Sequence, residues 1–371
     1  MATSTIIILV AFVVYLAMMV TIGAFYSKKS ANTEDYFLGG RNLGGFVAAL
    51  SAQASDMSGW LLMGLPGAIY LSGMNSGDGW CALGLLIGTI LNWLLVASRL
   101  RKYTIKANNS VTLPMFFENR YKDEKKVLMF ISSVIIVIFF AVYCASALAA
   151  GGKLFQSIFG VDYKIALTLG ALVILIYTFL GGFMAVCVTD FIQGTLMLIA
   201  LLAVPILAIT CMNNDGITIA NGLANSDKVL DAIIANEPDF AAARATSAGF
   251  INMFSGVNAV GVISGLAWGL GYFGMPHILV RFMAVKNEKE MRKSKVVAIS
   301  WVTISLAMAC VIGIIGRAYM SFADVVDAGK EKVFILMIQR VFSGAPFIAG
   351  IFLCGILAAS ISTADSQLFV S

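Results

Sequence analysis

Long apolar blocks separated by short polar segments dominate the chain. Each of nine blocks is long enough to cross a bilayer as a helix, because about 20 apolar residues span the hydrocarbon core. The predicted spans are 5–25, 44–73, 80–98, 127–151, 164–181, 183–211, 250–275, 296–320 and 344–371. The pattern therefore predicts an all-α polytopic membrane protein, a single transmembrane domain over residues 1–371 with its longest loop at about 212–249.

The composition agrees with this class. Of the 371 residues, 60% are hydrophobic and 12% are charged, with a mean hydropathy of +0.90. A typical soluble protein has about 25% charged residues. The net charge of +5 comes from basic residues in the loops that flank the spans, so it indicates membrane topology and no nucleic-acid partner. The expected environment is the lipid bilayer.

The distribution of lysine and arginine predicts the orientation. If the N-terminus lies outside, the inward loops hold 17 of the 25 basic residues, among them Arg281. Cytoplasmic loops of membrane proteins carry such an excess. We therefore expect a multi-pass protein of the cell inner (plasma) membrane with its N-terminus outside, and no basic residue deep within a span.

Several classes of chemistry lack their signature residues. The six cysteines form no CxxC pair and lie mostly in apolar stretches, so we interpret them as packing thiols. His277 is the single histidine, which excludes a histidine-rich metal site. The chain has no nucleophile–base–acid set and no phosphate-binding loop. We expect no enzyme activity, no cofactor and no obligate protein partner.

Three acidic residues, Asp56, Asp190 and Asp365, fall within predicted spans. An unpaired carboxylate at the bilayer centre costs at least ~2.5 kcal/mol, so each needs a reason to be there. One reason is a cation supplied from solution. The alternative is a capped or snorkelling acid near a helix end.

The polar run from Ser51 to Trp60 interrupts the second predicted span at its middle, and Gly64, Pro66 and Gly67 follow. Lipid offers the backbone no hydrogen bonds, so such a run suits a helix that unwinds inside a protein-lined cavity. Freed carbonyls there can coordinate sodium. The alternative is a small-residue face for helix packing.

Two other spans carry related signals. The seventh is rich in glycine and includes Trp268 and Tyr272, which indicates either a kinked helix facing a ligand or a glycine-packed helix. In the ninth, Ala359, Ser362 and Thr363 share one helix face and offer a carbonyl and two hydroxyls to a hard cation. Ordinary hydroxyls bonded back to the helix are the alternative there.

At these residues the chain resembles the sodium/solute symporter family over essentially its whole length. The resemblance rests on Gly39-Gly40-Arg41, the run Ser51 through Gly67, Tyr143-Cys144-Ala145-Ser146, Thr189-Asp190, Trp268 through Gly274, Pro276-His277, Leu357-Ala358-Ala359 and Ser362-Thr363.

The resemblance implies an inverted five-plus-five helix transporter core preceded by one extra helix. The extra helix would be 1–25, the first repeat 44–211 and a partial second repeat 250–371. The family has about thirteen spans, so we expect the chain to end four spans short, with its second repeat incomplete.

The resemblance also implies the site and the activity. Sodium would be bound by the carbonyls of Ala54, Met57 and Ala359 and the hydroxyls of Ser362 and Thr363. Asp56 would support sodium coupling, and Asp190 would lie on the inward sodium path. Substrate would contact Ser58, Trp60, Gly64, Tyr143, Trp268, Tyr272 and Pro276.

The implied function is sodium-coupled symport of L-proline into the cell by alternating access. Three alternatives remain open from the residues. The first is sodium- or proton-coupled symport of another small solute, such as pantothenate, a sugar or a carboxylate. The second is the membrane part of a solute sensor, and the third is a non-functional fragment.

Overall fold

The computed structural model describes residues 3–27, 33–74, 77–234, 247–255, 257–320, 325 and 329–370. The basic residues Lys28 and Lys29 and most of the expected 212–249 loop beyond residue 234 lie outside the described part.

The longer helices are α1 (Thr3–Ser27), α3 (Gly45–Gly59), α5 (Gly77–Leu91), α8 (Val127–Phe159), α9 (Tyr163–Asn214), α10 (Ile219–Ile234), α14 (Glu288–Tyr319) and α17 (Pro346–Val370). The shorter helices are α2 (Thr33–Leu38), α4 (Leu65–Ser72), α6 (Ala97–Lys106), α7 (Leu113–Tyr121), α11 (Ser247–Phe250), α12 (Ala259–Ala267), α13 (Pro276–Ala284) and α16 (Val333–Val341). Short segments of other helix types are η1 (Gly39–Arg41), η2 (Trp60–Gly64), η3 (Asn92–Val96), η5 (Trp268–Gly274) and η6 (Lys330–Lys332).

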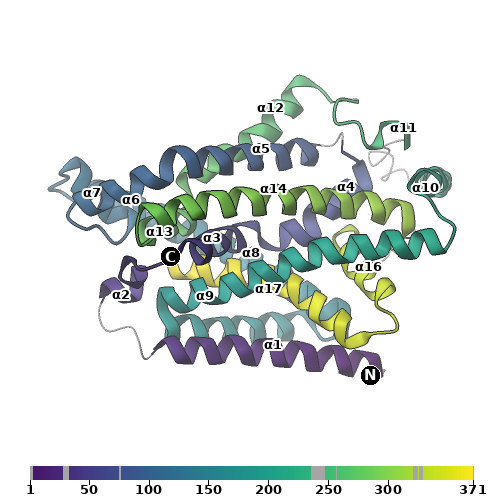
Figure 1. Ribbon diagram of the computed structural model, residues 1–371, viewed down its shortest axis with the longest axis horizontal. Helices are drawn as coiled ribbons and strands as arrows, with labels where there is room; N and C mark the ends of the chain where they lie inside the picture. The colour runs from purple at the N-terminus through teal and green to yellow at the C-terminus, as the bar shows by residue number, and fades with distance from the viewer. Residues whose placement is uncertain are drawn as a thin grey trace.

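The long helices lie side by side along one direction, as Figure 1 shows. Helix α1 runs along one edge of the bundle, and α5 and α12 lie at the opposite edge. The N-terminus is at the same end as α10 and α11, whereas α2, α6, α7 and α13 gather at the other end with the C-terminus (Figure 1). The long helices thus run back and forth between the same two ends of the molecule, as the apolar blocks predict.

Six of the described helices are long and apolar enough to cross a membrane, or seven if one bent pair counts as a single span. The six are Thr3–Tyr26, Gly77–Lys106, Val127–Phe159, Gly181–Asn214, Glu288–Tyr319 and Pro346–Val370. The chain is therefore a multi-pass helical membrane protein. The nine-span count and the division into 1–25, 44–211 and 250–371 stay predictions.

The expected spans 44–73 and 164–181 are absent from these six because the helices there are interrupted or short. In the first, the backbone breaks at Ser58 and continues through the π-helical turn η2 into α4. In the second, the apolar helix is short, Tyr163–Ile176, and Gly182 (φ 62°, ψ −167°) separates it from the next long segment. A left-handed φ is open to glycine at no steric cost. Gly182 lies at the boundary expected between 164–181 and 183–211.

The seventh expected span, 250–275, lies later in the chain than the pattern predicts, at Ala259–Gly274 followed by Pro276–Ala284. Its helix begins at Ala259, where the Asn258 side chain accepts a hydrogen bond from the Gly261 amide at 2.7 Å. It then passes through η5, and Pro276 starts α13, with a bend of 47° between the two parts. Because proline suits the first turn of a helix, Pro276 restarts the span rather than ending it. Arg281 consequently lies inside this bent span instead of in a loop.

Helices α3 and α17 form the centre of the bundle. In α17, 83% of the most apolar 18-residue window is buried, whereas the corresponding window of α8 has no buried residue. Every α3 residue from Ala48 to Met57 is buried, including Ser51, Gln53, Ser55 and Asp56. The most polar segment of the second expected span is therefore held within protein and away from lipid, where its polar groups can find partners.

Candidate functional site

The break in the second expected span is at Ser58. Its backbone has φ 51° and ψ −174°, a region that residues other than glycine rarely adopt. The Ser58 hydroxyl accepts a hydrogen bond from the Trp60 amide at 3.1 Å, and the same amide donates to the Met57 carbonyl. These two hydrogen bonds stabilise the interrupted backbone. Helix α3 therefore ends inside the protein, where Gly59 is buried.

At this break, α17 approaches α3 closely. The Ser362 hydroxyl donates to the Ala54 carbonyl at 2.8 Å and lies 3.4 Å from the Ala359 carbonyl. Among the described residues, the buried Thr363 hydroxyl has no hydrogen-bond partner. A buried polar group without a partner costs free energy. This group of oxygens therefore has unused capacity to accept a cation.

Four of the five expected sodium ligands lie where α17 approaches α3, and the fifth, Met57, lies close to the end of α3. Ala54, Ala359 and Ser362 are brought together directly, and Thr363 lies next to Ser362 on the same buried helix. Met57 is also buried, and its carbonyl already accepts the Trp60 amide. A carbonyl has a second lone pair, so that bond leaves the oxygen able to accept a cation. Carbonyl and hydroxyl oxygens suit a hard cation, and within the described ranges no cluster of three His, Cys, Asp or Glu side chains could hold a metal.

Asp56 lies beside this group of oxygens and faces a histidine. Its Oδ1 is 3.8 Å from His277 Nε2, and no residue that the structure describes hydrogen-bonds its Oδ2. The Asp56 carbonyl accepts the Tyr143 hydroxyl at 3.1 Å. On its other side, His277 Nδ1 lies 3.2 Å from the Gln367 amide nitrogen. The imidazole thus bridges α3 and α17 next to the break, a role that the sequence reasoning did not assign to it.

A cavity of about 310 Å³, which we call the central cavity, opens beside Asp56. It is lined by Asp56, Met57, Ser58, Trp60, Leu85, Tyr143, Ser146, Trp268, Gly271, Tyr272 and Met275. Five of the seven expected substrate residues, Ser58, Trp60, Tyr143, Trp268 and Tyr272, therefore meet in one place. Apolar and aromatic walls with a few polar groups are typical of sites for small solutes.

The other two expected substrate residues lie elsewhere. Gly64 lines an adjoining cavity of about 240 Å³, which we call the connecting cavity. Pro276 lines a different cavity, of about 260 Å³, together with Phe37 and Val370. As the first residue of α13, Pro276 sets the bend that aims η5 and Tyr272 at the central cavity, and it has no place in that cavity's wall.

Two glycines of the seventh expected span, Gly265 and Gly269, pack closely against α5, whereas a Cβ atom on Gly271 or Gly274 would meet no described atom within 4 Å. A Cβ atom on Gly84 of α5 would lie 2.7 Å from the Gly265 carbonyl oxygen of α12. The Asn92 side chain donates to the Tyr272 carbonyl at 2.9 Å and holds η5 against η3, the turn that follows α5. Tyr272 is buried while Trp268 is 65% exposed. Glycine packing therefore accounts for the Gly265–Gly269 part of this span, and Trp268 and Tyr272 line the central cavity; that they face a ligand stays a prediction.

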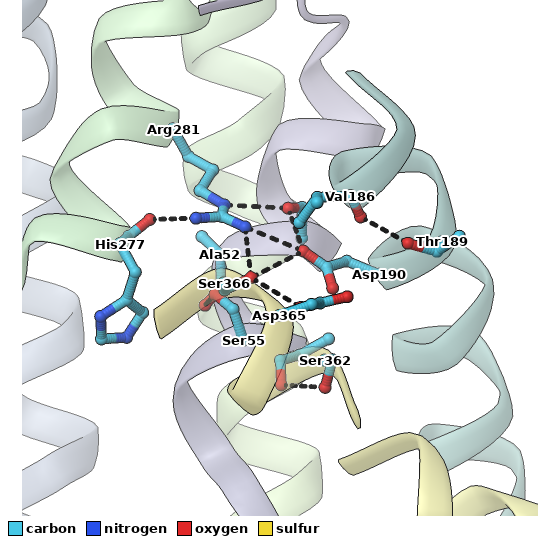
Figure 2. Close-up of polar contacts among 12 residues, drawn as sticks. Ala52, Ser55, Val186, Thr189, Asp190, His277, Arg281, Ser362, Asp365 and Ser366 are labelled. Carbon is cyan, nitrogen blue, oxygen red and sulfur yellow. Dashed lines mark hydrogen bonds and ion pairs between the residues drawn. The ribbon is translucent and has the colours of Figure 1, made fainter. Parts of the chain in front are cut away.

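The expectation that no basic residue lies deep in a span is wrong for Arg281. Its Nη2 is 2.9 Å from Asp190 Oδ2, and both side chains are fully buried. Figure 2 shows the guanidinium group between α3, α9, α13 and α17. It also donates to Ser51 Oγ (3.0 Å), the His277 carbonyl (2.6 Å) and Ser366 Oγ (2.6 Å).

This buried network changes the interpretation of Asp190. The Ser51 hydroxyl also donates to Asp190 Oδ2, at 2.7 Å, so one carboxylate oxygen receives both Arg281 and Ser51. Asp190 therefore has a cation from the chain itself, and its presence in a span does not by itself require an ion from solution. The signal for Arg281 is in the sequence: it stands between the apolar residues Ile278–Val280 and Phe282–Ala284.

The comparisons with known proteins agree with this architecture. The model of the sodium:solute symporter family matches residues 36–371. The sodium/proline symporter of Salmonella typhimurium (strain LT2) is 44% identical over 366 residues, 98% of this chain and 68% of that protein. The sodium/proline symporter of Escherichia coli (strain K12) is 43% identical with the same coverage. That of Staphylococcus aureus (strain NCTC 8325) is 42% identical over 96% of this chain and 65% of its own length.

A solved structure shares the fold. The substrate-bound, outward-open state of a Na⁺-coupled sialic acid symporter superposes with a TM-score of 0.74 over 98% of this chain and 72% of that one. Its sequence is 20% identical, so the likeness concerns the fold alone. The family match covers most of the chain, including both halves of the α3–α17 contact. The chain belongs to the sodium:solute symporter family.

Proposed function

We propose that the chain carries L-proline into the cell together with sodium, by alternating access. The observation that supports this most directly is the contact between α3 and α17, where Ser362 meets the Ala54 carbonyl beside the central cavity. Sodium/proline symporters 42–44% identical to the chain support proline as the substrate.

In this proposal sodium binds among the oxygens of Ala54, Met57, Ala359, Ser362 and Thr363. The ion ties the broken end of α3 to α17, because ligands on both helices must stay within coordination distance at once. Asp56 adds negative charge next to the ion, which favours cation binding inside a low-dielectric core. Sodium thus favours the arrangement of the break that the substrate needs.

L-Proline then occupies the central cavity. Its apolar ring contacts the aromatic side chains of Trp60, Tyr143, Trp268 and Tyr272, and the open backbone near Ser58 receives its charged groups. Asp190 is held by Arg281 and Ser51 and lies eight residues after Gly182, which lies beside Tyr36 of α2. It is therefore close to the end of the bundle that carries α2 and α13. We place this end in the cytoplasm and the N-terminus outside, in accord with the basic residues at the α2, α6 and α7 end.

The test is uptake of labelled proline by proteoliposomes that contain the chain. We expect accumulation when sodium is higher outside and none when potassium replaces sodium. Ser362→Ala and Thr363→Ala should each raise the sodium concentration for half-maximal uptake by about tenfold or more, since each removes one cation ligand.

Ser305→Ala is the matched control. Ser305 is a buried serine in α14, a different helix from those of the proposed ligands, and its hydroxyl has no hydrogen-bond partner in the described part of the chain. Sodium dependence in this variant should equal that of the unaltered chain. Equal uptake in sodium and in potassium would contradict the proposal, and so would an unchanged sodium requirement in Ser362→Ala and Thr363→Ala.

A further inference from the structure

A row of cavities leads away from the central cavity toward the C-terminal end of α8. The connecting cavity shares Ser58, Trp60, Tyr143 and Ser146 with the central cavity. It shares Met63, Lys153 and Glu331 with a third cavity of about 380 Å³, which we call the entrance cavity. A solute on this route must therefore pass Lys153 and Glu331 before it reaches Asp56.

Lys153 and Glu331 face each other at the junction of these two cavities. Lys153 Nζ lies 2.9 Å from Glu331 Oε2, and the side chains are 53% and 46% exposed. The two residues come from different parts of the chain, α8 and η6. An ion pair that is open to water contributes little to stability, so other partners can exchange with it readily.

Helix η6 is held firmly where it carries Glu331. It packs directly on α4, where a Cβ atom on Gly67 would lie 2.5 Å from the Lys330 carbonyl oxygen. The absence of a side chain at Gly67 allows this close contact. The Glu331 backbone is thereby fixed relative to the end of the broken second span, and its carboxylate remains at the wall of both cavities.

The chemistry of this junction matches one class of solute. A free amino acid carries an ammonium group and a carboxylate on the same carbon. Inserted between Lys153 and Glu331, it replaces one ion pair by two charge-assisted contacts, carboxylate to Lys153 and ammonium to Glu331. A solute with a single charge gains one contact and meets repulsion from the like-charged partner, which opposes its binding.

We propose that Lys153 and Glu331 form an outer docking site for zwitterionic amino acids, which precedes the central cavity on the inward route. This inference rests on the proposed function. The site captures the substrate by both charges, and the ion pair re-forms when the substrate moves on to the connecting cavity.

Kinetics of proline uptake in proteoliposomes test the docking site. Lys153→Gln and Glu331→Gln should each raise KM for proline by about threefold to tenfold, because each removes one charge-assisted contact, while the maximal rate stays within about a factor of two. Lys332→Gln is the matched control. It removes a positive charge from the wall of the same entrance cavity but not from the pair, so KM should not change.

Three results would overturn the docking site. One is an unchanged KM in both Gln variants. Another is a fall in the maximal rate at constant KM, which would indicate that the pair acts as a latch. The third is an equal rise of KM in Lys332→Gln, which would indicate general attraction by the cavity.

Failure of the proposed function would look different, because the unaltered chain would then take up no proline. In that case, equilibrium binding of a panel of labelled zwitterionic amino acids to the purified chain tests the docking site independently of proline transport. Weaker binding of any of them to Lys153→Gln than to Lys332→Gln would support the docking site. Equal binding, or no binding of any amino acid, would reject it.

Discussion

The buried pair of Arg281 and Asp190 yields a quantitative prediction. Arg281 contacts Asp190, Ser51, Ser366 and the His277 carbonyl, all within 3.0 Å. Removal of one partner from a buried ion pair leaves an uncompensated charge and costs about 3–5 kcal/mol. We therefore expect Asp190→Leu and Arg281→Met each to lower the free energy of unfolding by about this amount.

The double variant should be far less damaging than the sum of the two. It removes both charges together and replaces them with apolar side chains, an exchange that is often close to neutral in protein interiors. Because each single variant costs about 3–5 kcal/mol and the double variant is close to neutral, the coupling energy between the two sites should exceed about 3 kcal/mol, the upper end of the usual range for residues in direct contact.

Unfolding in mixed micelles of rising SDS content, followed by circular dichroism, measures the four proteins of this cycle. Lys102 and Glu288 provide the control pair, since their atoms are 3.5 Å apart but their side chains are 61% and 38% exposed. Their coupling energy should stay below about 1 kcal/mol. Strict additivity for Arg281 and Asp190 would refute the reasoning, because it would mean that the two charges do not stabilise each other in the folded protein.

Three further changes have defined outcomes. Asp56→Ala should nearly abolish sodium-driven proline uptake while circular dichroism still shows folded protein, because it removes the carboxylate beside the proposed cation site; robust uptake would disprove that role. Ser58→Gly should raise the free energy of unfolding by up to about 1 kcal/mol, because relief of about 1–3 kcal/mol of backbone strain is partly offset by the lost Trp60 amide bond and by the greater freedom of glycine in the unfolded chain; a protein less stable by more than about 1 kcal/mol in the same SDS titration would count against strain at the break. Arg41→Met should lower it by about 2–4 kcal/mol, because Arg41 donates to the carbonyls of Met283 and Ser110 from a buried position; no loss of stability in that titration would mean that these bonds are not maintained.

The hydrophobic pattern predicted the helical membrane class and the polar break in the second expected span. It did so because the pattern is local: lipid excludes unpaired backbone, so a run such as Ser51 to Trp60 can lie mid-span only inside protein. The boundary near Gly182 and the shared face of Ser362 and Thr363 are also local features. These parts of the fold follow from short stretches of residues and the chemistry of the bilayer.

The pairing of Arg281 with Asp190 could not be obtained in this way. The two residues are 91 positions apart, and their contact depends on how α13 bends after Pro276 and packs against α9. In the sequence, Arg281 stands close to the basic residues of the following loop, so its charge was assigned to that loop. His277 was missed for a related reason, since a lone histidine has no pattern that could reveal Asp56 and Gln367 on either side of it.

The pairing of Arg281 with Asp190 also bears on how the membrane voltage acts on the protein. A positive and a negative charge 2.9 Å apart have no net charge, so moving them together through the membrane field requires no net electrical work. Zwitterionic proline is likewise neutral as a whole. Under the proposed function the current of a transport cycle is carried by sodium alone, at ~2.3 kcal/mol per 100 mV for each ion. Transport should therefore be electrogenic, with a charge-to-proline ratio that equals the number of sodium ions coupled to each proline.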